Sequence, residues 1–106
     1  MTLGKYIKHR RIELGMRQGD VAARLLAPST GRTINSSYLC EIEKGTRRPT
    51  SHYLLAQLSI SLAVPFDYIC FLAGVLPSEA VARYSNARPE AVERAFTAFR
   101  DVLEAE

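Results

Sequence analysis

Cysteine and histidine are scarce in this chain of 106 residues, which contains only two of each. Two cysteines cannot form a disulfide framework, and the two histidines show no ligand spacing that would complete a zinc site. We therefore expect no metal and no cofactor. Cys70 is expected in the core, and Cys40 is expected to be a half-buried packing residue rather than a redox-sensing thiol. His9 and His52 are expected to take surface or capping roles.

A long uninterrupted apolar run is also missing. The most apolar stretch, residues 53–76, carries Pro65 and Asp67 at its centre, whereas a membrane-spanning helix needs about 20 apolar residues in a row. The stretch therefore predicts two buried helices separated at Pro65, and no membrane partner. No apolar run follows the first positive charges, so we expect no signal peptide. Together with free cysteines, this favours a cytoplasmic location.

The side-chain sets that catalysis needs are lacking as well. We find no nucleophile–base pair and no phosphate-cradling glycine loop, and a small helical domain offers little room for a cleft. The sequence therefore predicts that the protein is not an enzyme. Its apolar fraction of 47% and charged fraction of 24% are typical of a globular protein with a core.

Charge is distributed unevenly along the chain. Residues 1–50 contain ten basic and four acidic side chains, a net charge of +6, whereas residues 51–106 carry −3. A basic half joined to an acidic half suggests that the first half faces a polyanion. A chance asymmetry on a solvated surface would give the same count.

Apolar spacing and helix-breaking residues predict three short helices in the first half. The first ends at Gly15, and the second covers residues 18–26. Residues 27–33 contain a proline and a glycine and predict a loop. A third helix is expected between an N-cap at Asn35 and a left-handed residue at Gly45.

The second half predicts three further helices. Thr50 is suited to cap a fourth, Pro65 to start a fifth, and Gly74 to end it. Residues 77–88 predict a connection with a short helical segment, and Pro89 opens the last helix. No segment shows sustained strand alternation, so the predicted class is all-α.

The last helix carries a narrow apolar seam of the coiled-coil kind. The seam consists of Val92, Phe96, Phe99 and Leu103, with Ala95 and Val102 beside it. It can pack on the protein's own core or pair with a second copy, and the sequence leaves both open.

Two short helices joined by a turn, within residues 18–44, raise the hypothesis of a helix-turn-helix. In helical projection, Leu39 and Glu43 share the inner face, whereas Ser37 and Lys44 lie on the opposite side. Reading of a DNA major groove requires such an outward row of hydrogen-bonding side chains. Every amphipathic surface helix also has a polar outer face, so the projection alone does not decide.

The residues that flank these two helices favour the hypothesis. Thr46, Arg47 and Arg48 directly follow the third helix, where a helix inserted in a groove would leave the duplex beside phosphates. Arg17 and Gln18 open the second helix, whose N-terminal amides can also hold a phosphate.

A buried carboxylate needs a cationic partner. Glu43 is expected on the inner face of the third helix, and Arg11 is expected to face inward on the first. We therefore predict a structural Arg11–Glu43 ion pair that joins these two helices.

Many of these residues together resemble a known family. They are Leu3-Gly4, Ile7, Arg11, Gly15, Gln18, Val21-Ala22, Leu25 and the run Tyr38-Leu39-x-x-Ile42-Glu43-Lys44-Gly45-x-x-Arg48-Pro49-Thr50. With this pattern, the segment of residues 2–76 resembles the lambda-repressor/Cro-like (Xre-type) family of helix-turn-helix DNA-binding domains.

The resemblance implies a five-helix DNA-binding domain at residues 1–76, followed by a linker and an amphipathic helix at residues 77–106 for dimerisation or packing. It implies a sequence-specific regulator of transcription that binds double-stranded DNA. Such a protein would be a homodimeric repressor or autoregulator at an inverted-repeat operator. The alternative is a protein-binding module, such as the antitoxin of a toxin–antitoxin pair, whose acidic last helix docks on a protein partner.

The resemblance also assigns roles position by position. The matching base-facing positions are Ser36, Ser37, Tyr38, Glu41 and Lys44. The matching backbone-contacting positions are Gln18, Asn35, Arg47 and Arg48. Arg11 and Glu43 match a structural ion pair of the family.

The chain departs from the family's pattern at three places. Residues 26–33 lengthen the turn between the second and third helices, and Arg32 in this insertion is expected to reach a phosphate. Arg17 stands where Ser or Thr usually caps the second helix, which leaves that role to water or Asp20. Glu41 is an acid at a base-facing position, where it would accept from a cytosine amine or point away from DNA.

Overall fold

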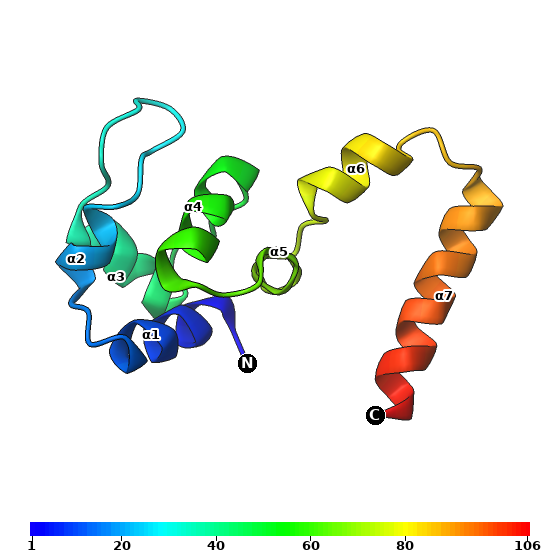
Figure 1. Ribbon diagram of the computed structural model, residues 1–106, viewed down its shortest axis with the longest axis horizontal. Helices are drawn as coiled ribbons and strands as arrows, with labels where there is room; N and C mark the ends of the chain where they lie inside the picture. The colour runs from blue at the N-terminus through cyan, green and yellow to red at the C-terminus, as the bar shows by residue number, and fades with distance from the viewer.

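The computed structural model describes all 106 residues, and its regular secondary structure is entirely helical (Figure 1). The helices are α1 (Leu3–Glu13), α2 (Gln18–Ala22), α3 (Ser36–Lys44), α4 (His52–Leu62), α5 (Phe66–Ala73), α6 (Ser78–Tyr84) and α7 (Pro89–Ala105). The β-type pairing is limited to one isolated bridge between Leu26 and Thr33. The predicted all-α class is confirmed.

A side-chain cap explains where α3 begins, and two glycines explain where α3 and α5 end. The Asn35 side chain accepts a hydrogen bond from the Tyr38 amide at 2.8 Å and so caps α3. Gly45 then takes a φ of +84°, and Gly74 ends α5 in the same way with a φ of +79°. A residue without a β-carbon adopts this left-handed conformation at little cost. Both helix ends and the cap were predicted from the sequence.

Two predicted helix starts are wrong by one residue. α4 is capped by Ser51 rather than Thr50, because the Ser51 hydroxyl accepts from the Leu54 amide. Pro65 is the residue that caps α5 rather than its first helical residue. Thr50 and Ser51 are adjacent hydroxyl residues that local patterns cannot rank, and a shift of one residue at a helix end is within the ordinary range for both helices.

The predicted second helix is too long, since α2 stops at Ala22. Beyond it, the Leu25 carbonyl accepts a hydrogen bond from the Ile34 amide at 2.9 Å. The Leu26 amide donates to Oε1 of Gln57 on α4 at 2.7 Å, and the Leu26 carbonyl accepts from Nε2 of the same side chain at 3.1 Å. These long-range bonds replace the helical bonds that the apolar pattern predicted.

Helices α1 to α5 enclose a single core of 15 buried apolar residues, including Cys70. The most apolar stretch forms α4 and α5, and the leucines of α4 are buried. α1 and α3 cross in backbone contact at Gly4, where a β-carbon would collide with the carbonyl oxygens of Ile42 and Glu43. No helix is both long enough and apolar enough to cross a membrane.

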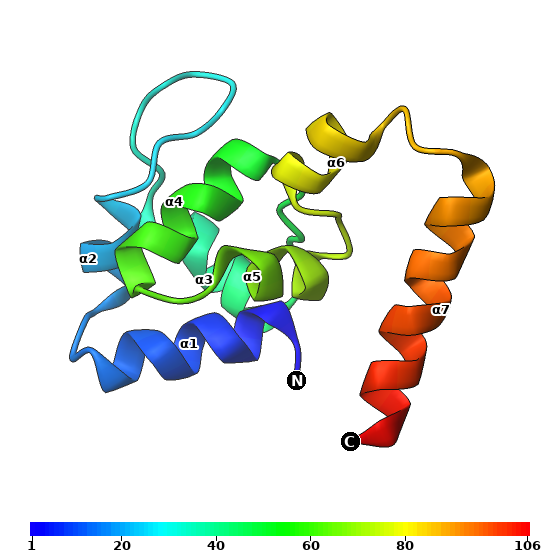
Figure 2. The same ribbon diagram turned by 45° about the vertical axis from the view of Figure 1, so that its right-hand side comes forward.

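The insertion at residues 26–33 forms a narrow loop that extends away from the helices, as both ribbon views show (Figure 1 and Figure 2). Its base is closed by the hydrogen bond from the Ala27 amide to the Arg32 carbonyl, at 2.8 Å. At the start of α3, Ser36 and Ser37 remain exposed. The long turn therefore leaves these two positions uncovered.

The C-terminal arm, which consists of α6 and α7, stands apart from the core. α7 lies beyond α6 and to one side of the other helices (Figure 2), and the radius of gyration is 15.5 Å, against about 13 Å for a compact domain of this length. The predicted seam residues are exposed, with Phe96 at 44% and Phe99 at 50%. A contact between the Phe71 and Phe99 rings, 6.1 Å between centroids, links the arm to α5. The protein's own core therefore does not cover the seam.

Candidate nucleic-acid interface

A buried ion pair holds the inner face of α3 against α1. Arg11 donates from Nε and Nη2 to the two carboxylate oxygens of Glu43, at 2.7 and 3.0 Å. Its Nη1 donates to the Met16 carbonyl at 2.9 Å, in the turn that leads to α2. The ion pair expected from the sequence is thus present, and it also ties down the turn between the first two helices.

Gln18 completes this network instead of standing free at the surface. Its side-chain amide donates to Oε1 of Glu43 at 3.0 Å. The Glu43 side chain is only 3% exposed, and the hydrogen bonds that it makes with Arg11 raise the pKa of the guanidinium. The sequence assigned the Gln18 side chain to a phosphate, but its amide nitrogen is already used to brace α3.

The outer edge of α3 presents polar groups that are not used elsewhere in the fold. Ser36, Ser37 and Lys44 are exposed, and Lys44 has no ion-pair partner in the chain. The inner side carries Leu39 and Ile42, both buried in the core. One side of the helix is therefore fixed, and the other is free to meet a ligand.

Beside this edge, Tyr38, Glu41 and Arg47 form a polar cluster. Arg47 Nε donates to Glu41 Oε2 at 2.7 Å, and the guanidinium carbon lies 4.5 Å from the centre of the Tyr38 ring. The hydrogen bond to Glu41 raises the pKa of Arg47. Arg47 was expected to contact the DNA backbone, and Glu41 was expected to accept from a cytosine amine or to point away from DNA. The structure instead pairs them, so that Glu41 offsets the positive charge of Arg47.

The cluster borders a shallow depression of about 300 Å³, which Asn35 and Ser37 also line. Asn35 uses its side-chain oxygen to cap α3. Thr46, just beyond α3, donates from its hydroxyl to the Glu41 carbonyl at 3.2 Å. The polar residues at both ends of α3 thus also hold the helix ends in place.

Three further cations predicted to contact the DNA backbone lie away from this cluster. Arg17 is largely exposed, and Arg32 lies in the projecting loop. A guanidinium nitrogen of Arg48 lies 3.8 Å from where a β-carbon would stand at Gly74, so its side chain reaches toward the end of α5. The structure therefore distributes the predicted cations over several elements rather than in one row.

Asp20, at the third position of α2, accepts a hydrogen bond from the backbone of the N-cap residue Arg17, which is the reciprocal bond of a capping box. Its Oδ2 accepts from the Arg17 amide at 2.8 Å. This hydrogen bond, followed by the nearby charge of Arg17, lowers the pKa of the Asp20 carboxyl. Asp20 thus takes part in the N-terminus of α2, as one of the two alternatives expected, and Arg17 makes no side-chain cap there.

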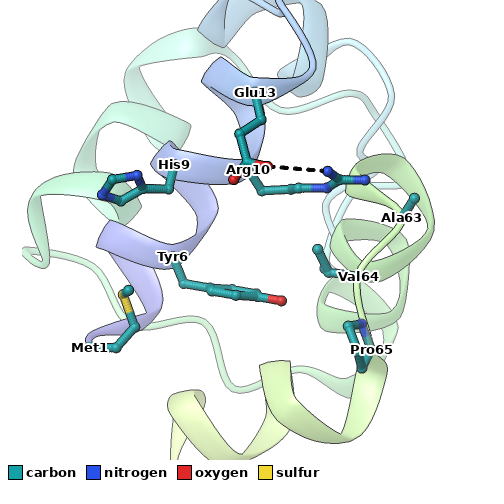
Figure 3. A pocket seen from close by; sticks show the side chains of 8 residues that line it. All are labelled: Met1, Tyr6, His9, Arg10, Glu13, Ala63, Val64 and Pro65. Carbon is teal, nitrogen blue, oxygen red and sulfur yellow. Dashed lines mark ion pairs between the residues drawn. The ribbon is translucent and has the colours of Figure 1, made fainter.

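A second concavity, of about 460 Å³, lies between α1 and the junction of α4 and α5 (Figure 3). The Tyr6 ring points across it, and the Arg10 guanidinium lies beside Ala63 (Figure 3). Arg10 Nε donates to the Leu62 carbonyl at 2.8 Å, and Nη1 lies 3.6 Å from Glu13 Oε2. Because the guanidinium already caps α4 and is paired with an acid, it is a weak site for an anionic ligand.

The remaining reactive side chains do not gather into a site. Cys40 is half-buried and Cys70 is buried, and both thiols are free. Burial raises the pKa of the Cys70 thiol. His52 bonds through Nε2 to the Leu76 carbonyl at 2.6 Å. No three His, Cys, Asp or Glu side chains lie together as a metal site would need.

A scan against protein-family models, a search of curated proteins and a search of solved structures each found no match to this chain.

Proposed function

We propose that this protein is a sequence-specific regulator that binds double-stranded DNA through α2 and α3, used as a helix-turn-helix. The observation that carries the proposal is the two-sided character of α3. Its inner side is locked to α1 and α2 by Arg11, Glu43 and Gln18, whereas its outer edge presents unpaired polar groups. A DNA-reading helix needs both, because its base contacts must be held at a defined position.

The dimensions of α3 agree with this role. An α-helix with its side chains is about 10–12 Å in diameter, which fits a major groove about 12 Å wide, and the nine residues of α3 extend about 13 Å along it. Recognition helices of this type contact bases mainly with their N-terminal residues. Ser36 and Ser37 hold that place here, and Lys44 at the other end would reach a base edge or a phosphate.

The charge of the first half of the chain supports the same proposal. The first 50 residues carry a net charge of +6, and phosphate contacts from such a surface supply most of the non-specific affinity for DNA. Arg17, Arg32, Arg47 and Arg48 are proposed to meet the backbone. The Arg47–Glu41 pair is exposed, so a phosphate can replace the carboxylate at small energetic cost.

The proposed functional unit is a homodimer on an inverted repeat. Two α3 helices related by a twofold axis would enter successive major grooves about 34 Å apart. The proposed DNA-binding domain covers residues 1–76, and the seam on α7 is proposed to hold the two copies together. The physiological role would then be that of a repressor or autoregulator.

The test begins with selection of bound duplexes from a random DNA pool by the full-length protein. We expect one recovered motif with inverted symmetry. Fluorescence anisotropy on that duplex should then show affinity falling by about 10³-fold or more between 50 and 200 mM salt, because about six phosphates would be neutralised. Recovery of no common motif, or affinity that does not change with salt, would contradict the proposal.

Matched variants separate base contacts from general charge. Lys44→Ala and Arg94→Ala each remove one positive charge, but Arg94 lies on α7, away from α3. We expect Lys44→Ala to cost about 1–3 kcal/mol on the selected duplex and less on scrambled DNA. Arg94→Ala should change neither. Equal losses from both variants would mean that Lys44 contributes only through net charge.

One observation favours the second candidate, a protein-binding module. The seam on α7 is exposed in the single chain, and an exposed apolar surface of this kind marks an interaction site. If this candidate is correct, the protein alone will be monomeric and will select no duplex.

A further inference from the structure

The exposed seam of α7 has the pattern of a two-stranded coiled coil. Phe96 and Leu103 occupy one of the two core positions of the heptad, and Val92 and Phe99 occupy the other. All four are between 38% and 53% exposed. A 17-residue helix gains most of its stability from packing of its apolar face, so this face needs a partner surface.

The residues beside the seam identify a second copy of this chain as that partner. One flank carries Glu93 and Arg100, which have opposite charges and lie one heptad apart. The other flank carries the uncharged Ala95 and Val102. In an antiparallel pair each flank faces its own counterpart, so Glu93 would lie beside Arg100 of the partner subunit, twice by symmetry. A helix pair is stabilised by such opposite charges along its flanks.

In a parallel pair, Glu93 and Arg100 would not lie beside each other. Each charged flank would then face the uncharged flank of the other helix, which leaves Arg100 beside Ala95 of the partner subunit. The residue that would meet Glu93 is Arg88, which precedes α7 and has a non-helical backbone. Complementary charges therefore favour the antiparallel arrangement.

The same symmetry sets the register of the two helices. With the twofold axis between Thr97 and Ala98, Phe96 packs on Phe99 of the partner subunit. Val92 then packs on Leu103 of the partner subunit. Every large seam residue meets another large seam residue, and none is left over.

A neighbouring groove extends the apolar surface beyond α7. It has a volume of about 590 Å³ and lies between α5 and α7, with Phe71 and Leu76 on one side and Phe96 and Phe99 on the other. Both Phe71 and Leu76 are about half exposed. A stable interface buries roughly 800 Å² per partner. Contact with this groove would supply further apolar area.

We infer that two copies of this chain associate through an antiparallel α7 pair, with Glu93 of each copy beside Arg100 of the partner subunit and the Phe71 groove enlarging the interface. The inference rests on the dimer of the proposed function but does not depend on DNA. It specifies the orientation, the register and the charge pairs of that dimer.

The test reverses the charge of Glu93 or of Arg100 in the full-length chain. Dimerisation is then measured without DNA by sedimentation velocity. In Glu93→Arg or Arg100→Glu homodimers, both attractive pairs become repulsive. We expect the dimer Kd to rise roughly 10- to 30-fold in each variant. An equimolar mixture of the two variants should form heterodimers with nearly the wild-type Kd, because one chain then carries two arginines and the other two glutamates.

The matched controls are Arg94→Glu and Asp101→Arg, which make the same charge changes on the side of α7 opposite the seam. We expect neither to change the dimer Kd. A wild-type protein that is monomeric at about 100 μM, a mixture that does not re-form dimers, or controls that weaken the dimer equally would overturn the inference. A dimer with the expected charge dependence that selects no duplex would leave the inference intact and contradict the DNA-binding proposal alone.

Discussion

The ion pair behind α3 allows the most quantitative prediction, through the substitution Glu43→Ala. In the wild type, Arg11 is held by two hydrogen bonds to Glu43 and one to the Met16 carbonyl, with only 11% of its side chain exposed. The substitution leaves this guanidinium largely buried without a counter-charge. It also removes the acceptor for the Gln18 amide.

The expected cost follows from the burial. Removal of one partner from a buried ion pair destabilises a protein by about 3–5 kcal/mol. The bond from Arg11 to Met16 remains, and partial exposure gives the guanidinium some access to water. We therefore expect the lower end, about 3 kcal/mol. In a domain of this size, such a loss lowers the Tm by about 12–24 °C.

Thermal and urea denaturation, monitored by circular dichroism at 222 nm, provide the measurement. The matched control is Glu79→Ala, which removes an exposed partner of Arg83 on α6 and should change stability by less than about 0.5 kcal/mol. The double variant Arg11→Met/Glu43→Leu tests the cause. It should recover most of the lost stability, because a packed apolar pair can replace a buried ion pair.

Two results would contradict a stabilising role of the Arg11–Glu43 pair. If Glu43→Ala melts within a few degrees of the wild type, the pair does not brace α3. If the double variant is as unstable as Glu43→Ala, the loss does not come from an uncompensated charge on Arg11. If the Glu43→Ala protein is folded but binds DNA more weakly than the wild type, the ion pair also positions α3 for binding, in addition to stabilising the fold.

Three further predictions concern single positions around α3 and α2. Gly4→Ala should destabilise the protein by about 2–3 kcal/mol in thermal denaturation, because α1 and α3 must separate to admit the methyl group. Glu41→Gln should strengthen binding to the selected duplex several-fold and steepen the salt dependence by about one unit of slope, because it releases Arg47 for a phosphate. For Asp20, the lowered pKa means that its contribution to stability is present above about pH 4 and is lost as the pH falls through the lowered value. Carboxyl titration by NMR should give an Asp20 pKa below the ordinary range, and Asp20→Asn should abolish this part of the acid destabilisation.

Each of these predictions has a result that contradicts it. A Gly4→Ala protein with the wild-type Tm would mean that α1 and α3 are not in backbone contact. Glu41→Gln with unchanged affinity would show that Arg47 does not contact the backbone of DNA. An ordinary titration of Asp20 would mean that its hydrogen bond to the Arg17 amide is absent in solution.

Much of the local structure was accessible from the sequence because it depends on neighbouring residues. Asn35 caps α3 by a bond to a residue three positions away, and the glycines at positions 45 and 74 end helices through their own backbone freedom. The Arg11–Glu43 pair spans 32 residues, yet it too was predictable. Helical periodicity placed both side chains inward, and a buried carboxylate requires a cation.

Other features required the tertiary structure because their partners are distant in the chain or cannot be ranked locally. Gln57 binds the Leu26 backbone, 31 residues away, and holds the chain where it leaves α2 for the loop. No local pattern marks this glutamine. Glu41 lies six residues from Arg47, but their pairing depends on the direction of the chain after Gly45.

Local sequence patterns were enough to predict the helical class, several helix ends, the burial of Cys70 and the buried pair behind α3. Periodicity and capping are short-range effects that act before the chain is packed. Packing in three dimensions was needed to show that the insertion at residues 26–33 projects outward, that Gln18 and Glu41 are held by other side chains, and that α7 stands off the core. These outcomes depend on which surfaces meet after folding, because many arrangements satisfy the same local preferences and packing selects one among them.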